Sequence, residues 1–210
     1  MRLVEGFIYL CFSLYQITFC QMKKGAAWMG FVYPIKDSSQ IEALEQELRR
    51  RGERDYILFL FGIYSGLRIS DILALRVEDV GAQNRIQLKE AKTGKEKSFP
   101  IAKPLRKALN QYLQGHSEKY LFPSPKKKGY PITRQQAYWI FNEAAKQVGI
   151  QESIGTHTLR KTFAYWAYKK GTSLELIQKI LNHSSPSVTL RYIGITQEQI
   201  DEVYENLSFR

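Results

Sequence analysis

A chain of 210 residues with 44% hydrophobic content is long enough to bury one sizeable core, and its composition is that of a globular protein. The 31 basic and 20 acidic residues leave a net charge of +11 and a pI near 9.6, which favours nucleic acid as the partner, with an anionic membrane surface second. The two cysteines, Cys11 and Cys20, exclude a disulfide framework and a cysteine zinc site, so we expect a reducing cytoplasm.

Residues 6–20, "GFIYLCFSLYQITFC", form an apolar and aromatic run. The run is shorter than the roughly 20 residues that span a bilayer, contains Ser13 and Gln16, and lacks the cleavage site of a signal peptide. Three interpretations stay open: an ordered segment packed on the domain, an upstream extension before a natural start at Met22, and a membrane anchor. We assign residues 1–34 to an N-terminal extension and expect no membrane partner.

Residues 37–52, "DSSQIEALEQELRRRG", predict a helix with capping-box spacing at Ser39 and Glu42 and an end at Gly52. Cations at the end of a helix stabilise its dipole, and they also suit contact with a DNA backbone. Both readings stay open for the arginines that crowd this end: Arg49, Arg50, Arg51 and Arg54.

Residues 54–66, "RDYILFLFGIYSG", are apolar on nearly all sides, which predicts a helix buried at the centre of the domain. Gly66 ends this helix, and Arg68 lies in the turn into the next short helix. An arginine there either pairs with Asp71 at the surface or, mounted on a rigid buried turn, binds a phosphate.

Residues 85–101, "RIQLKEAKTGKEKSFPI", alternate apolar and polar side chains on both sides of Thr93-Gly94, which predicts a β-hairpin. Its lysines either discourage edge-to-edge aggregation or serve a site: Lys92, Lys95 and Lys97.

An amphipathic helix follows over 103–115, and we assign no role to His116. The proline-rich loop 122–133 carries Lys126, Lys127 and Lys128 at a solvated tip or on a basic arm that reaches along DNA. A helix then starts after the cap residue Thr133.

The last third of the chain holds the residue types that suit a phosphodiester. His157 and Arg160 are three residues apart and therefore share one face of a helix, while His183 lies nine residues before Tyr192. Guanidinium groups such as that of Arg68 bind non-bridging phosphate oxygens in pairs, imidazoles move protons, and a phenol attacks phosphorus. These five side chains predict one site that acts on a phosphodiester.

The segments "SGLRIS", "HTLRKTFA" and "LNHSSPSVTLRY" resemble the signature boxes of the tyrosine recombinases, or phage integrase family, in the family's order and spacing. The resemblance covers roughly residues 35–205. It implies a mainly α fold with a small antiparallel β-sheet at one edge (α+β), similar to the DNA breaking-rejoining enzymes. The sequence departs from the usual pattern at Asn182, where a Gly is usual, and at Lys161, where a His is usual.

The resemblance also implies a mechanism and its residues. Tyr192 is the nucleophile that forms a 3′-phosphotyrosyl intermediate, and His157 accepts its proton. Arg68 and Arg160 stabilise the charge on the phosphorane. Neither a metal, nor ATP, nor another cofactor is expected.

Two further catalytic roles and a set of DNA contacts follow from the resemblance. Lys92, the first Lys of "KTG" on the hairpin, protonates the leaving oxygen, and His183 donates a hydrogen bond to a non-bridging oxygen. The expected DNA contacts are Lys95, Lys126, Lys127, Arg134, Gln135 and Lys161.

Residues 35–210 are thus expected to form an integrase-type catalytic domain that binds double-stranded DNA as a homo-oligomer, a tetramer, although a monomer is possible in solution. The predicted helix 196–207 has an apolar stripe that needs cover, and relatives dock this helix on a neighbouring subunit. Fewer than 70 residues precede Arg68, so a separate DNA-clamping domain is not expected.

Two other functions stay open on the sequence alone. One is a DNA-binding accessory or regulator without chemistry, which the missing clamp favours and the intact catalytic set opposes. The other is a relaxing activity like that of type IB topoisomerases, which share this active site. A metal-dependent nuclease is disfavoured because Asp71, Asp79 and Glu90 form no recognisable metal motif.

Overall fold

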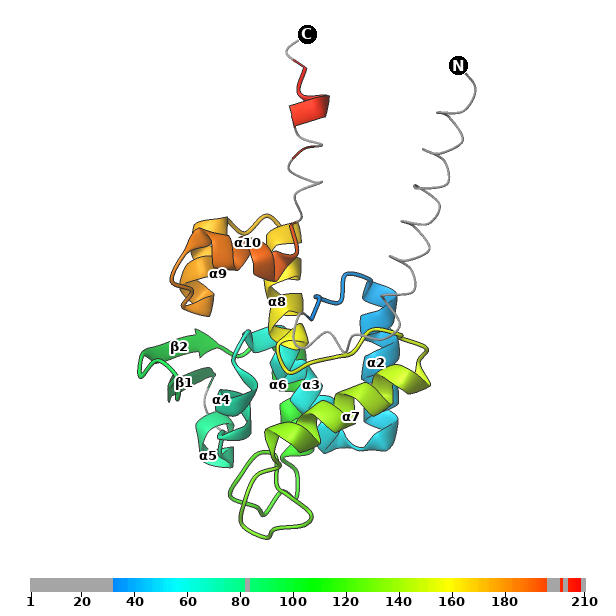
Figure 1. Cartoon of the computed structure of the whole chain (residues 1–210). Helices are drawn as coiled ribbons and strands as arrows, with labels where there is room; N and C mark the ends of the chain where they lie inside the picture. Colours follow the sequence, from blue (N-terminus) through cyan, green and yellow to red (C-terminus); the bar gives the residue numbers. More distant parts are fainter. Residues whose placement is uncertain (1–31, 82–83, 196–200, 202–203, 209–210) are drawn as a thin grey trace. The chain divides into compact units, whose positions relative to one another are not determined.

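The computed structural model describes residues 32–81, 84–195, 201 and 204–208, and Val32–Arg210 forms one compact unit (Figure 1). The N-terminal apolar run lies outside the described residues. The helices and strands in chain order are α2 (Ser38–Arg51), α3 (Glu53–Ser65), α4 (Ile69–Leu73), α5 (Val77–Val80), β1 (Arg85–Lys89), β2 (Glu96–Pro100), α6 (Lys103–Tyr112), α7 (Arg134–Gln147), α8 (Thr158–Lys169), α9 (Leu174–Leu181) and α10 (Pro186–Ile193). The predicted mainly helical fold with a small antiparallel sheet is confirmed.

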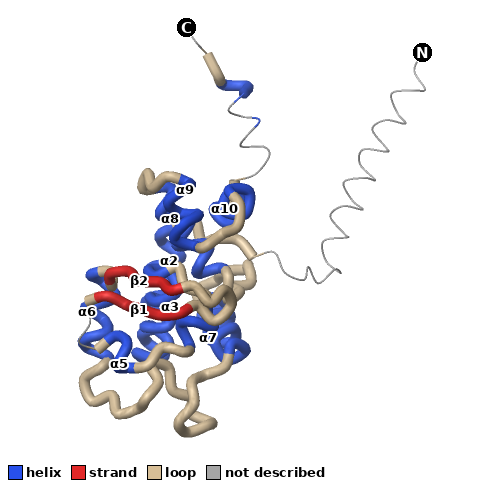
Figure 2. Tube along the Cα trace, turned by 90° about the vertical axis from the view of Figure 1, so that its left-hand side faces the viewer, coloured by secondary structure: helices blue, strands red, loops and turns tan. Residues whose placement is uncertain are grey.

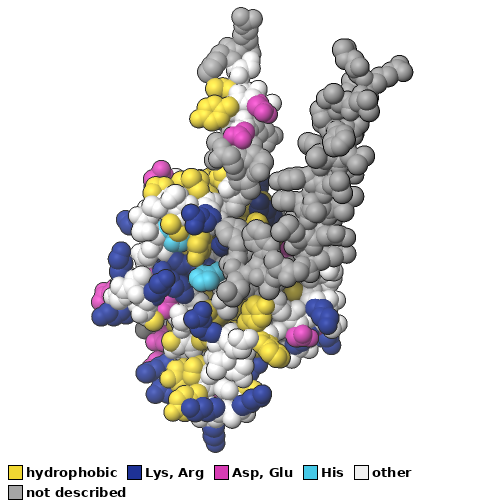
Figure 3. All heavy atoms as spheres, in the orientation of Figure 1, with side chains coloured by type: hydrophobic (Ala, Val, Ile, Leu, Met, Phe, Trp, Pro, Cys, Tyr) yellow, Lys and Arg dark blue, Asp and Glu magenta, His cyan; other side chains and the backbone are white. Residues whose placement is uncertain are grey.

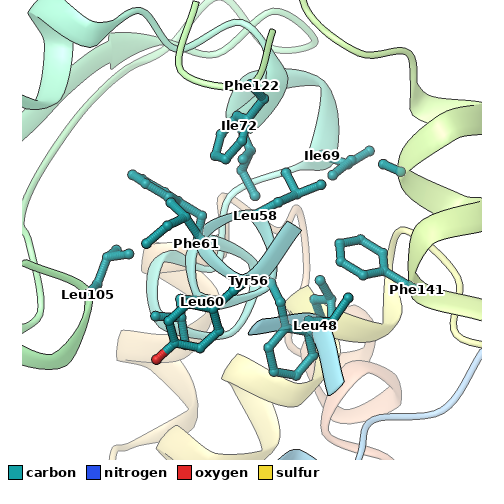
Figure 4. Packing of buried hydrophobic residues seen from close by; sticks show 14 of the residues in the cluster. Leu48, Tyr56, Leu58, Leu60, Phe61, Ile69, Ile72, Leu105, Phe122 and Phe141 are labelled. Carbon is teal, nitrogen blue, oxygen red and sulfur yellow. The ribbon is translucent and has the colours of Figure 1, made fainter. Parts of the chain in front are cut away.

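Helix α3 lies at the centre of the domain, as its sequence predicts. Its apolar residues from Ile57 to Phe61 are at most 2% exposed, and α2, α6 and α8 pack around it. Aromatic side chains from other segments meet it edge to face: Phe61 and Phe122 have ring centroids 5.8 Å apart (Figure 4). A helix that is apolar on all sides is stable only when it is buried on all sides, so α3 fixes the positions of its neighbours.

Helix α2 begins two residues earlier than the predicted cap at Ser39 implies. Its N-cap is Asp37, whose carboxylate accepts a hydrogen bond from the Ser39 amide at 2.8 Å, so the predicted Ser39–Glu42 capping box is wrong. Aspartate caps at least as well as serine and stands two residues upstream. At the other end, Arg50 and Arg51 bind the Glu47 carboxylate at 2.8 and 2.7 Å, which gives both arginines a role within the fold.

The two strands pair in the register Ile86↔Phe99 and Leu88↔Lys97, and residues 90–95 connect them. Figure 1 shows the hairpin at the left-hand edge of the helical body, and Figure 2 views that side, with the two strands next to each other in front of the helices. Ile86 is fully buried and Ile101 is 9% exposed, so one face of the hairpin covers the core. This face also carries the side chains of Lys97 and Phe99, which alternate with exposed residues along β2.

Helices α9 and α10 pack with α8 around a second, smaller apolar cluster: Ala164, Ile177, Leu181 and Ile193. Helix α9 ends at Asn182, which adopts the left-handed conformation (φ 51°) that Asn tolerates better than most residues. Only part of the predicted final helix lies among the described residues, and there Tyr204 and Leu207 are exposed. Among the described helices, none combines the length and the apolar character needed to cross a membrane.

Candidate active site

The site forms where the three sequence boxes meet. Arg160 is buried on α8, and its guanidinium donates hydrogen bonds to the backbone carbonyls of Gly66 and Leu181. Gly66 belongs to the turn between α3 and α4, and Leu181 is the last residue of α9. One side chain thus joins segments that are about a hundred residues apart in the sequence.

Burial, and after it the charge of Arg68, lower the pKa of Arg160 to about 10. The guanidinium therefore stays cationic at neutral pH. Its two bonds to carbonyls leave further N–H donors of the five that a guanidinium carries. Figure 3 shows histidine side chains among Lys and Arg side chains on this face of the molecule. Such a concentration of positive charge suits a phosphate.

Arg68 lies in the turn before α4, as predicted, but its partner is a different acid from the one considered. Its Nη1 lies 2.8 Å from Glu90 Oε2, although its N–H groups do not point well enough at that oxygen to form a hydrogen bond. Of the two readings left open for Arg68, the surface pair with Asp71 does not form, because Asp71 is buried and accepts a hydrogen bond from the Ala91 amide at 3.0 Å. Only 15% of the Arg68 side chain is exposed, consistent with a rigid buried mount.

The Tyr192 hydroxyl lies 3.3 Å from His157 Nδ1, and the Tyr192 ring lies against the His183 ring with centroids 4.4 Å apart. Tyr192 is on α10 and His157 is the N-cap residue of α8, so tertiary packing alone brings them together. Partial burial, followed by the charges of Arg160 and other nearby cations, lowers the pKa of His157. Histidine in its neutral form can accept a proton.

Sequence reasoning missed Thr189, which is fully buried on α10. Its hydroxyl lies 3.0 Å from His183 Nδ1, while His183 Nε2 is buried and makes no hydrogen bond within the described part of the chain. Burial, with the charges of Arg160 and Arg68, lowers the pKa of His183 to about 4, so its ring is neutral at pH 7. A hydroxyl that donates to Nδ1 places the ring proton on Nε2, which is then free to donate to a phosphate oxygen. A Thr six residues after a His gives no pattern that sequence reasoning could have used.

The structure places the hairpin lysines differently from one another. Lys92 lies exposed in the connection 90–95 and makes no hydrogen bond or ion pair within the described residues. Lys97, to which sequence reasoning gave no role, has a buried ammonium group that also lacks a hydrogen bond there. Burial first, and then the charge of Arg160, lower the pKa of Lys97 to about 8. The available signal was the strand alternation, which puts Lys97 on the same inward face as Phe99.

The expected DNA contacts divide by exposure. Most of them lie at the surface: Lys95, Lys126, Lys127, Arg134 and Gln135. Lys161 does not, because its side chain is buried and its ammonium donates to the Val32 carbonyl at 2.7 Å, 5.3 Å from the centre of the Tyr192 ring. This placement argues against the direct DNA contact expected of Lys161.

Within the described residues, no group of three His, Cys, Asp or Glu side chains is arranged to hold a metal ion.

Comparison with known proteins identifies the family. The model of the phage integrase family matches residues 36–199. The chain is 44% identical over 178 residues to the probable integrase/recombinase YoeC of Bacillus subtilis (strain 168), a match that covers 84% of this chain and 97% of that protein. It is 31% identical over 153 residues to the tyrosine recombinase XerD of Mycobacterium leprae (strain TN), which covers 68% of this chain and 48% of XerD. The chain thus spans about half the length of that relative.

Solved structures show the same fold. The XerA recombinase superposes with a TM-score of 0.70 at 23% identity, over 86% of this chain and 68% of that one. The XerH recombinase bound to its palindromic difH substrate gives a TM-score of 0.66 at 20% identity, over 84% of this chain and 54% of that one. Because the family model matches most of the residues and a relative of 44% identity is covered almost completely, the chain belongs to the phage integrase family, the tyrosine recombinases, which cut and rejoin DNA through a 3′-phosphotyrosyl intermediate.

Proposed function

We propose that this chain is a site-specific DNA recombinase in which Tyr192 attacks the scissile phosphorus. The bond from the tyrosine oxygen to phosphorus forms and the bond from phosphorus to the 5′ oxygen breaks. The tyrosine proton passes to His157, and the leaving 5′ oxygen takes a proton from Lys92. A 5′-hydroxyl then attacks the phosphotyrosine and reverses the step. The phosphodiester energy is kept in the phosphotyrosine, so the reaction consumes no ATP.

The observation that carries this proposal is the contact between the Tyr192 hydroxyl and His157 Nδ1 at 3.3 Å. A free phenol has a pKa of about 10 and needs a nearby base to attack at neutral pH. The neutral ring of His157 supplies that base, because its pKa is lowered by burial and by nearby cations. Arg68 and Arg160 lie beside this pair and stabilise the negative charge that builds up on the phosphorane.

The partner is double-stranded DNA, and the reaction takes place in the cytoplasm. Exposed basic residues on α7 and on the loop before it would hold the phosphate backbone, with Arg134 and Gln135 nearest the bases. The relatives YoeC and XerD support this reading, because they are named as integrase and recombinase.

We further propose that four copies assemble on DNA through the C-terminal helix. Its described part exposes Tyr204 and Leu207, which need apolar cover. A groove of about 520 Å³ between β2, the end of α3, α8 and α9 exposes Leu176 and is lined by Phe99, Phe163 and other residues. A neighbouring copy would place its C-terminal helix there.

The test is a suicide-substrate assay with DNA that is nicked close to the cleavage site, so that the 5′-hydroxyl fragment is lost and the covalent intermediate accumulates. Candidate DNA comes first from the regions that flank the gene. The reaction is run in EDTA with the wild type and with Tyr192→Phe, which removes one oxygen and keeps the ring. We expect a protein–DNA adduct that survives SDS in the wild type and is absent in the variant.

The other outcomes select between the remaining functions. Binding to this DNA without an adduct would overturn the proposal and favour a DNA-binding regulator. An adduct accompanied by relaxation of supercoiled plasmid, with no exchange between two sites, would favour a topoisomerase-like activity. An adduct that forms only with added divalent metal would contradict the proposed chemistry.

A further inference from the structure

Glu90 has no role in the mechanism above, although it lies between the phosphate-binding Arg68 and the hairpin connection that carries Lys92. It follows β1 directly and is 1% exposed. Its backbone closes the hairpin connection, because its amide donates to the Lys95 carbonyl at 2.9 Å and its carbonyl accepts from the Gly94 amide at 2.8 Å. Lys92 lies within this closed connection, two residues from Glu90.

One oxygen of the Glu90 carboxylate, Oε2, contacts three segments of the site. It accepts a hydrogen bond from the Thr93 hydroxyl at 2.7 Å, and Thr93 is the neighbour of Lys92. It accepts a second hydrogen bond from the Asn182 side-chain amide at 3.1 Å, next to His183. It also forms the ion pair with Arg68 at 2.8 Å. The Glu90 carboxylate therefore holds the hairpin connection, the end of α9 and the first catalytic arginine in one network.

Glu90 is ionised in this network. Burial by itself raises the pKa of a carboxyl group, but the hydrogen bond from Thr93, the Arg68 guanidinium and the hydrogen bond from Asn182 outweigh it and bring the pKa of Glu90 to about 2. A fixed negative charge beside a phosphate site opposes the binding of the phosphate. The charge of Glu90 by itself therefore disfavours substrate binding. Its three contacts offset this cost by holding the segments of the site together.

Asn182 adds to this interpretation. It adopts the left-handed conformation that a glycine would adopt without strain, so the backbone alone does not require an Asn. Its side-chain amide is instead used on Glu90. Asn182 and Glu90 are 92 residues apart in the sequence and act as one contact between the hairpin and the end of α9.

We propose that Glu90 is a positioning residue that, through Thr93 on one side and Arg68 and Asn182 on the other, sets the hairpin connection so that Lys92 reaches the leaving oxygen at the scissile phosphate. This inference rests on the proposed cleavage by Tyr192. Lys92 is exposed in the free protein, so its ammonium needs a fixed turn to arrive at one atom of bound DNA. The proton that it donates goes to the 5′ oxygen as the bond from that oxygen to phosphorus breaks.

The test separates proton donation from the rest of the chemistry. Glu90→Gln keeps the size of the side chain and removes the charge that holds Arg68. The matched control is Glu96→Gln, which neutralises an exposed carboxylate on the same hairpin. Each protein cleaves two suicide substrates, one with the natural 5′ oxygen at the scissile bond and one with a 5′-bridging sulfur. A thiolate leaves without being protonated, so the sulfur substrate does not need Lys92.

We expect Glu90→Gln to cleave the oxygen substrate at least ~10-fold more slowly than the wild type, with complete loss of the general acid, ~10²–10⁴-fold, as the upper limit. On the sulfur substrate we expect the same variant to be slowed clearly less, because only its weaker hold on Arg68 still acts there, and we expect Glu96→Gln to match the wild type on both substrates. Equal slowing of Glu90→Gln on both substrates would overturn the proposal and assign Glu90 to the phosphate pocket or to folding. Unchanged rates on both would also overturn it.

A second measurement does not depend on activity. Hydrogen exchange of the amides in 90–95 is compared among the wild type, Glu90→Gln and Asn182→Gly, which removes the side-chain amide and leaves a residue that tolerates the left-handed backbone at this position. We expect faster exchange in both variants and no change elsewhere in β1 and β2. If the wild type forms no adduct on either substrate, the proposed function fails, and exchange still decides whether Glu90 fixes the connection. Unchanged exchange in both variants would overturn that role.

Discussion

Replacing Gly66 by alanine tests whether the turn between α3 and α4 positions Arg160. Gly66 has φ +60°, and a Cβ built there lies 2.6 Å from Phe163 Cδ1, closer than real Cβ contacts. The left-handed conformation costs an alanine about 1–2 kcal/mol. Overpacking against the partly buried ring of Phe163 adds up to about 1–3 kcal/mol. We therefore expect Gly66→Ala to lower the free energy of unfolding by roughly 2–5 kcal/mol.

The control for this variant is Gly149→Ala. Gly149 has φ +77° and no atom within 4 Å of a built Cβ, so only the conformational cost of about 1–2 kcal/mol applies. Urea unfolding of both variants, followed by circular dichroism, measures the difference. Gly66→Ala should also slow adduct formation under conditions where it is folded, because the Gly66 carbonyl holds Arg160. A destabilisation no larger than that of Gly149→Ala would refute the packing of Phe163 on this turn.

Three further predictions concern titration and the histidines. Because the pKa of His157 is lowered, its neutral form persists to lower pH. The rate of single-turnover cleavage should therefore stay constant from pH 8 to 7, and its fall at acid pH should have a midpoint below 6.5. A midpoint above 6.5 would contradict His157 as the base. Thr189→Val should slow cleavage roughly 3- to 10-fold through loss of one hydrogen bond to His183, whereas Thr189→Ser should keep the wild-type rate, and equal rates for both would refute the assigned tautomer. The pKa of Glu90 is lowered, so the contribution of its carboxylate to stability is complete above the unfolded-state pKa near 4.3 and is lost as the pH falls toward 2. Urea unfolding should therefore show Glu90→Gln less stable than the wild type at pH 7, with a smaller difference at pH 3. A difference that stays constant between the two pH values would contradict the ion pair.

The sequence predicted the helices whose patterns are local. The all-apolar run of α3 and the alternation in the hairpin each determine an element within one segment, and the structure confirms both. Local chemistry was also where an element boundary was misjudged, since Asp37 and Ser39 are both good caps and only the folded backbone shows that Asp37 accepts the bond. Residues of the site could be named from the sequence because the three boxes carry them at fixed spacings.

Tertiary structure decided which of these residues meet and which others join them. Arg68 pairs with Glu90 rather than with Asp71, which is nearer in the sequence. The hairpin brings Glu90 to the turn before α4, while Asp71 accepts a hydrogen bond from the Ala91 amide. Lys161 is buried with its ammonium near the Tyr192 ring, although the sequence predicted a DNA contact for it. Thr189 joins the site without any local signal in the sequence, and for Lys97 the only local signal was the strand alternation that turns its side chain inward. Burial and partners depend on contacts between distant segments, and a spacing rule within one segment cannot contain them.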